Sequence, residues 1–159
     1  MMKLWNAVVE KGNAFSQTDL MNLEEARSFF KEQTFSGVAK LLEKVIKIYI
    51  LHPNNLGRCG HIANASYAGS DDIIVLGIGE KLAIHFLLTA KIKEFLVMPF
   101  NGVVATDMST IKLYEKLGFI KLGSVTNGFK TKSGNFEDIV FFYIELTEKV
   151  SLTEINRML

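Results

Sequence analysis

The chain has 159 residues, 48% of them hydrophobic and 22% charged, and a formal net charge of +1. This length predicts a single domain over residues 1–159, and this composition can fill a core without disulfides or metals. A charge so near neutrality lacks the basic surface typical of nucleic-acid-binding domains, so no nucleic-acid partner is expected.

The sequence does not predict a targeting signal or a membrane-spanning segment. The start, MMKLWNAVVEKGNAF, has no sustained apolar stretch before Glu10 and is a poor signal peptide. No window approaches eighteen apolar residues without a charge, so no spanning helix or membrane partner is expected. The single cysteine, Cys59, cannot form an intramolecular disulfide, which favours a reducing, cytoplasmic location.

The first half of the chain predicts one helix and three strands. Asn22 and Glu25 form a capping box, which predicts a helix that runs to about Lys31. The stretch GVAKLLEKVIKIYIL (37–51) predicts two short strands around a turn at residues 43–44. After the turn cluster HPNNLG, the stretch CGHIANASYAG (59–69) predicts another strand.

The segment SDDIIVLGIGEKL (70–82) leads into a helix expected from about Ile78 to Lys93. Glycines at positions 77 and 79 let the backbone approach a ligand closely, and the helix start presents unpaired N–H groups to an anion. The alternative is a tight strand-to-helix turn in which side chains would clash.

The remaining segments complete a mixed fold. EFLVMPF (94–100) predicts a strand that is unpaired on one side at Pro99. Asp107 or Ser109 is expected to cap a helix that ends before Gly118. Further predictions are two strands and a terminal helix, at about 119–126, 137–146 and 151–158. The order predicts an α+β domain with a mixed, mostly antiparallel sheet, flanking helices and a central β-α-β-α unit.

The segment TIKLYEKLGF (110–119) places Tyr114 on the apolar face of its helix. Tyr114 is either a core tyrosine or a general acid whose hydroxyl points into a cleft. This segment resembles the signature of the GNAT N-acetyltransferases, in which a helix with such an ending follows the fifth strand. GIGEKL (77–82) is similar to the glycine loop with which that family binds the pyrophosphate of coenzyme A.

Three further stretches resemble the branch of that family that acetylates small amino compounds such as proline analogues. They are GHIANASY, PFNGVVATD and the final NGFKTKSGNFEDIVFFYIEL. The resemblance covers about residues 5–146. It implies an acyltransferase that moves an acetyl group from acetyl-CoA directly to a primary or secondary amine of a small molecule, with no metal.

The resemblance also implies roles for individual residues. Tyr114 matches the tyrosine that protonates the leaving thiolate, and Asn64 is expected to contact the substrate. The cofactor would be bound by Asn101 and by two backbone segments: Tyr67, Ala68 and Gly69 for the pantetheine arm, and Leu76, Gly77, Ile78 and Gly79 for the pyrophosphate. For each asparagine the alternative is a structural amide at a strand bulge.

Other candidates carry weaker patterns. Glu10, His61 and Glu137 are candidate general bases, and a water chain would serve equally well. Cys59 and His61 share a strand face, but two ligands do not make a zinc site. Lys130 and Lys132, in the last loop, suit either a phosphate contact or a solvated charged loop.

The chain departs from the family pattern in three ways. The family loop usually carries Arg or Gln where this chain has Ile74, and often a basic residue where it has Leu76. Loss of one such hydrogen bond weakens binding by about 1.5–3 kcal/mol. The usual first strand is missing, because Met1 begins where the first helix should be under way, and the resulting sheet edge favours a homodimer. Asp107 replaces a preferred asparagine. These departures leave a degenerate, non-catalytic binding or structural protein of this fold as the alternative function.

Overall fold

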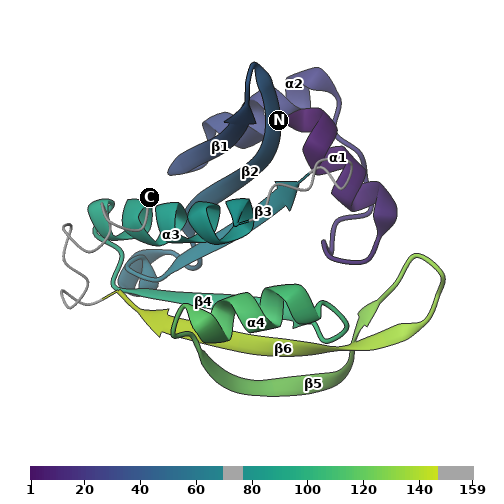
Figure 1. The fold of residues 1–159 in the computed structure, drawn as a ribbon, viewed down its shortest axis with the longest axis vertical. Helices are drawn as coiled ribbons and strands as arrows, with labels where there is room; N and C mark the ends of the chain where they lie inside the picture. Colours follow the sequence, from purple (N-terminus) through teal and green to yellow (C-terminus); the bar gives the residue numbers. More distant parts are fainter. Residues whose placement is uncertain (70–76, 147–159) are drawn as a thin grey trace.

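The computed structural model describes residues 1–69 and 77–146, which form a mixed, mostly antiparallel α+β architecture, as the sequence predicts (Figure 1). Its elements are α1 (Met2–Lys11), α2 (Leu23–Lys31), β1 (Phe35–Leu41), β2 (Lys44–Pro53), the 3₁₀ turn η1 (Gly57–Cys59), β3 (Ala63–Gly69), α3 (Ile78–Ile92), β4 (Val97–Val104), α4 (Met108–Lys116), β5 (Ile120–Lys130) and β6 (Phe136–Glu145). None of the helices in these two ranges is long and apolar enough to cross a membrane.

The strands form two antiparallel sheets, with the orders β1-β2-β3 and β4-β6-β5. The sheets meet at one end, where Ile62 and Val97 form a parallel bridge and the Leu96 N–H donates to the His61 carbonyl at 2.9 Å. Beyond that bridge, the described parts of β3 and β4 share no further ladder. The neighbouring edges of β3 and β4 are therefore left open along most of their length.

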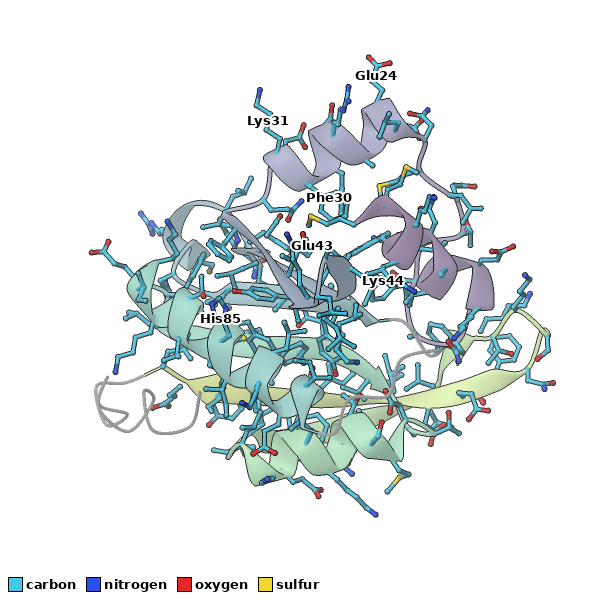
Figure 2. All side chains as sticks on the ribbon, turned by 45° about the horizontal axis from the view of Figure 1, so that its top comes forward. Glu24, Phe30, Lys31, Glu43, Lys44 and His85 are labelled. Atoms are coloured by element: carbon cyan, nitrogen blue, oxygen red, sulfur yellow. The ribbon has the colours of Figure 1, made fainter. Side chains whose placement is uncertain are left out.

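Helices α1 and α2 cover one face of the first sheet. Asn22 and Glu25 form the predicted capping box at the start of α2. Glu24 and Lys31 point away from the molecule, whereas Phe30 points inward (Figure 2). The Trp5 ring lies 4.5 Å from the Phe15 ring, and this aromatic cluster also contains both phenylalanines of α2. It packs against the even-numbered residues of β2, Ile48 and Ile50.

Helix α3 packs on the opposite face and contributes to a larger core that joins the two sheets. This core combines Tyr49 of β2, Phe86 of α3, Phe100 of β4 and Phe142 of β6. The Tyr49 side chain is fully buried, yet its hydroxyl contacts His85 Nδ1 at 2.8 Å and Thr89 Oγ1 at 3.0 Å. Burial raises the pKa of Tyr49 to about 12, although the hydrogen bond to Thr89 lowers it. Figure 2 labels His85 on α3.

Most elements agree with the predictions, but several boundaries shift. The predicted strand over residues 59–69 begins at Ala63, because residues 57–59 form a 3₁₀ turn. The strand expected from Glu94 begins at Val97, because Glu94 adopts a left-handed φ of 63°. Strand β5 is longer than predicted, because it pairs with β6 again at Phe129 and Lys130 after an irregularity at residues 126–128, whereas β6 keeps the predicted length and begins one residue earlier. As expected, Pro99 is paired on one side, opposite Tyr143 of β6.

The predicted helix at 151–158 lies outside the described residues.

Gly37 leaves the space that the Tyr49 ring occupies. A Cβ atom at position 37 would lie 2.0 Å from Cε1 of Tyr49, so Gly37→Ala must displace a fully buried ring. We expect the free energy of unfolding in urea to fall by about 1–3 kcal/mol. The control is Lys40→Ala on the exposed side of the same strand, which should change stability by less than about 0.5 kcal/mol. Equal stability of the two variants would contradict this packing.

Candidate functional site

A cavity of about 330 Å³ lies between the open edges of β3 and β4. Strand β3 contributes residues 64–67 to its wall, and β4 contributes residues 100–104. Helix α4 adds Asp107, Thr110 and Tyr114, while the β5–β6 hairpin and residues 13–17 close other sides. The cavity therefore exists because the two sheets join only at their other end.

Residues 64–67 of β3 line this cavity, and Ala68 and Gly69 continue the same strand beyond its wall. Strand β3 pairs with β2 on one side, and its other edge faces the opening toward β4. The Ala68 side chain packs in the cluster under α1, so only its backbone is available on the cavity side. Gly69 lies opposite Lys47, whose Nζ would be 2.8 Å from a Cβ at position 69. Because Nζ is the flexible end of the Lys47 side chain, this contact does not by itself require a glycine at position 69, and sequence reasoning did not identify it.

Packing against the described residues does not require the two glycines at the start of α3. Gly77 is the N-cap residue and has a left-handed φ of 77°. A Cβ at position 77 or 79 would meet no described atom within 4 Å. The predicted alternative, a turn in which side chains would clash, therefore has no support from the described atoms. No described atom occupies the space that a Cβ at position 77 or 79 would fill, at a helix end that exposes N–H groups.

The remaining predicted loop residues cannot be placed in this way. Leu76 lies outside the described residues, as do Ile74 and the two aspartates at positions 71 and 72.

Tyr114 is a core residue that also lines the cavity. Its side chain is only 1% exposed, and its ring lies 4.4 Å from the Phe100 ring and 4.8 Å from the Phe119 ring. Burial, followed by interaction with Tyr67, raises the pKa of Tyr114 well above its usual value. The hydroxyl is consequently protonated at neutral pH, so it can donate a proton but cannot act as a base.

A row of hydrogen bonds connects the cap of α4 with β3. The Tyr67 hydroxyl donates to Thr110 Oγ1 at 3.0 Å, and the Thr110 hydroxyl donates to Asp107 Oδ2 at 2.6 Å. Asp107 Oδ1 accepts from the Ser109 hydroxyl at 2.7 Å and from the Thr110 N–H at 3.1 Å. Asp107 is thus the helix cap, one of the two predicted residues.

Burial alone would raise the pKa of Asp107, but the hydrogen bonds from Thr110 and Ser109 outweigh it and lower that pKa. Burial raises the pKa of Tyr67 despite its hydrogen bonds. Sequence reasoning proposed only backbone contacts for Tyr67 and did not consider Thr110. The available signal was the spacing of Asp107 and Thr110, which is typical of a capping pair.

The two asparagines differ in their surroundings. Asn101 lies at the irregularity of β4 between Phe100 and Val103, and its Nδ2 donates to Asn54 Oδ1. This contact matches the structural role that was the alternative for Asn101, although the residue also lines the cavity. Asn64 lines the cavity and has no side-chain hydrogen bond to any other described residue. Its amide is therefore available for a ligand.

The candidate bases lie outside the wall of the main cavity. Glu10 borders a neighbouring cavity of about 680 Å³, together with Lys130 and Lys132. The Lys132 ammonium donates to the Glu10 carbonyl at 2.9 Å, and the Lys130 ammonium lies 6.0 Å from the centre of the Phe136 ring. Residues His61 and Glu137 line neither cavity. The described residues contain no cluster of three His, Cys, Asp or Glu that could hold a metal ion.

Comparison with known proteins finds one related sequence and several solved structures of the same fold. No family profile matches the chain. The N-acetyltransferase aca1 of Schizosaccharomyces pombe is 34% identical over 84 residues, which is 53% of this chain but only 40% of that protein. Two solved structures align with a TM-score of 0.84. One, yncA from Salmonella typhimurium with its cofactor acetyl-CoA, is 16% identical and covers 94% of this chain and 88% of its own.

The other is a GNAT superfamily phosphinothricin acetyltransferase from Sinorhizobium meliloti in complex with acetyl-CoA. It is 20% identical and covers 92% of this chain and 82% of its own. The chain has the GNAT fold. The fold predicted from the sequence is thereby confirmed.

The two glycines should respond differently to substitution. Gly77→Ala forces an alanine into a left-handed conformation and should reduce the free energy of unfolding by about 1 kcal/mol. Gly79→Ala adds a methyl group in open space within a helix and should leave stability unchanged or raise it by up to about 0.5–1 kcal/mol. Urea unfolding measures both. An equal loss in the two variants would mean that position 79 is internally packed.

Proposed function

We propose that this chain is an N-acetyltransferase that transfers the acetyl group of acetyl-CoA to a primary or secondary amine of a small molecule. The observation that carries this proposal is the buried, protonated Tyr114 on the wall of a cavity bordered by an open strand edge. The GNAT fold and the similarity to an N-acetyltransferase support the same conclusion.

Acetyl-CoA has groups that suit the backbone donors at the edge of β3 and at the start of α3. The pantetheine arm would lie along β3, where Tyr67 lines the cavity and the backbone of Ala68 and Gly69 continues the unpaired edge of the strand. Its pyrophosphate would lie at the start of α3, next to Gly77, Ile78 and Gly79. Helix N-termini favour anions through their unpaired N–H groups and the helix dipole. Such a site needs no basic side chain, although one would strengthen it.

The reaction is a direct transfer between two bound substrates. The neutral amine attacks the thioester carbonyl carbon, a C–N bond forms, and the C–S bond then breaks. The nitrogen loses one proton to water, and the departing sulfur takes one proton from Tyr114, which solvent later restores. Because a thiol is more acidic than a phenol, the thiolate is a good leaving group that needs little assistance, and the proton transfer from Tyr114 to the sulfur is itself uphill. Positioning of the two substrates supplies much of the rate, and a backbone N–H of β3 would stabilise the oxyanion.

The size and chemistry of the cavity favour a small acceptor. A volume of about 330 Å³ accommodates the acetyl end of the cofactor and a compact amine. Asn64 offers both a donor and an acceptor to orient that amine, and the wall between the two cavities is polar at Ser16 and Gln17. The name of one structural neighbour, a phosphinothricin acetyltransferase, supports a small acceptor as well.

Titration calorimetry tests the cofactor site. We expect acetyl-CoA to bind the wild-type chain at micromolar to sub-millimolar concentration, and Gly79→Ala to bind it at least about tenfold more weakly because the methyl group occupies the path of the phosphates. Dephospho-CoA, which keeps the pyrophosphate, serves as comparator. No binding of acetyl-CoA by the wild-type chain at millimolar concentration would overturn the proposal.

Removal of the Tyr114 hydroxyl tests the chemistry. Tyr114→Phe keeps the ring in its aromatic cluster and removes the proton donor. With an amine found by screening for thiol release, we expect kcat to fall by about 10- to 100-fold, at or below the lower end for general acids because the thiol is a good leaving group. The affinity for acetyl-CoA should stay within about twofold. An unchanged kcat would exclude Tyr114 as the proton donor.

A further inference from the structure

Lys47 lies across the last residue of the strand along which the pantetheine arm would lie. It pairs with Gly69 at the end of β3. A Cβ at position 69 would be 2.8 Å from Lys47 Nζ, 3.1 Å from its Cγ and 3.5 Å from its Cε. The lysine side chain therefore extends over β3. Since β2 occupies one edge of β3, the edge beyond Gly69 is the unpaired one.

The Lys47 side chain points to the face of the first sheet that α3 covers. Successive side chains of a strand point to opposite faces, so Lys47 shares its face with Tyr49. The Tyr49 hydroxyl contacts His85 and Thr89 of α3. Ile48, between the two, packs in the cluster under α1 on the other face. The Lys47 ammonium thus lies over the end of β3 on the side of α3.

The start of α3 lies at the same end of the sheet as Lys47. The far end of this helix is close to the beginning of β3, because the Leu96 N–H, shortly after α3, donates to the His61 carbonyl. The helix therefore runs antiparallel to β3, and its first residues lie toward Gly69.

Distances along the two elements agree with this placement. His85 and Tyr49 touch, so they mark one level of the helix and the sheet. From His85 back to Gly77, α3 extends about 12 Å. From Tyr49 to Lys47, β2 extends about 7 Å toward the same end, and the long lysine side chain reaches further. The ammonium and the N–H groups at the start of α3 are therefore close to the same stretch of open edge.

The charges around the start of α3 leave a role for this ammonium. The preceding segment, SDDIIVL (70–76), contains two aspartates and neither lysine nor arginine. The carboxylate of Glu80, in the first turn of α3, is already paired with Lys116 of α4 at 2.7 Å. Among the described residues, no hydrogen bond or ion pair uses the Lys47 ammonium.

We propose that Lys47 binds the pyrophosphate of coenzyme A and so supplies, from β2, the positive charge that the segment before α3 lacks. This inference rests on the proposed function, in which the pyrophosphate lies at the start of α3. The helix N–H groups would fix the position of the phosphates, and the ammonium would neutralise their charge as a mobile point charge. Gly69 leaves the lysine the space to reach them.

Titration calorimetry with coenzyme A and dephospho-CoA measures this contact in the full chain. Lys47→Met keeps an unbranched side chain of similar length and removes the charge, and we expect it to weaken binding of both ligands by about five- to twentyfold. Lys47→Arg keeps the charge and should stay within about threefold of the wild type. The unfolding midpoint should be unchanged in both variants.

Two controls separate charge from structure. Lys44→Met removes a charge from an exposed residue of the same strand, labelled in Figure 2, and should change affinity by less than about twofold. Acetylpantetheine has no pyrophosphate, so wild type and Lys47→Met should bind it equally. A loss of affinity for acetylpantetheine, or a loss confined to coenzyme A with none for dephospho-CoA, would overturn the inference, as would equal affinities of Lys47→Met and wild type.

Inorganic pyrophosphate tests the contact without the cofactor. In the full chain with ¹³Cε-labelled lysine, assigned with Lys47→Met, we expect pyrophosphate to shift the Lys47 signal saturably and to leave the Lys44 signal unchanged. Such a shift in a chain that binds no coenzyme A at millimolar concentration would overturn the proposed function alone. Absence of a saturable shift would overturn the inference, whether or not coenzyme A binds.

Discussion

The two sheets are joined by few backbone hydrogen bonds along their facing edges, and the cavity depends on this. One parallel bridge between Ile62 and Val97, with the neighbouring bond from Leu96 to His61, ties β3 to β4 at one end. An unpaired edge in the interior of a protein is unfavourable unless another group uses its donors and acceptors. Here the edge of β3 faces a cavity, so a ligand with an amide-rich chain would satisfy the groups that the protein leaves unpaired.

Local signals in the sequence were sufficient for most elements and for part of the site. The capping box at Asn22, the periodicity of α3 and the turn after Leu41 all depend on contacts within a few residues. Tyr114 was identified from a family motif. Its burial agrees with a core tyrosine, and its place on the cavity wall agrees with a general acid that points into a cleft. The predicted ends of elements were wrong where the backbone conformation of a single residue decides them, as at Glu94 with its left-handed φ.

Contacts between distant segments could not be predicted from the sequence. Nothing in the pattern around Tyr67 indicates that its hydroxyl reaches Thr110, 43 residues later, because that bond requires the relative placement of β3 and α4. The same holds for the contact between Lys47 and Gly69, which depends on the pairing of β2 with β3. The role of a glycine can be inferred only once the surrounding space is known: a Cβ at Gly79 would meet no described atom, whereas one at Gly37 would meet a buried ring.

Cys59 lies at the closed end of the two sheets, in the turn whose carbonyl accepts from the Ile62 N–H at 3.1 Å. It is exposed, it is the single cysteine of the chain, and it lines neither cavity. A fluorophore attached to this thiol would therefore sit beside the junction of the sheets without blocking the opening. The chain thus has a natural labelling point from which changes in the surroundings of the sheet junction can be followed by fluorescence, with no engineered cysteine.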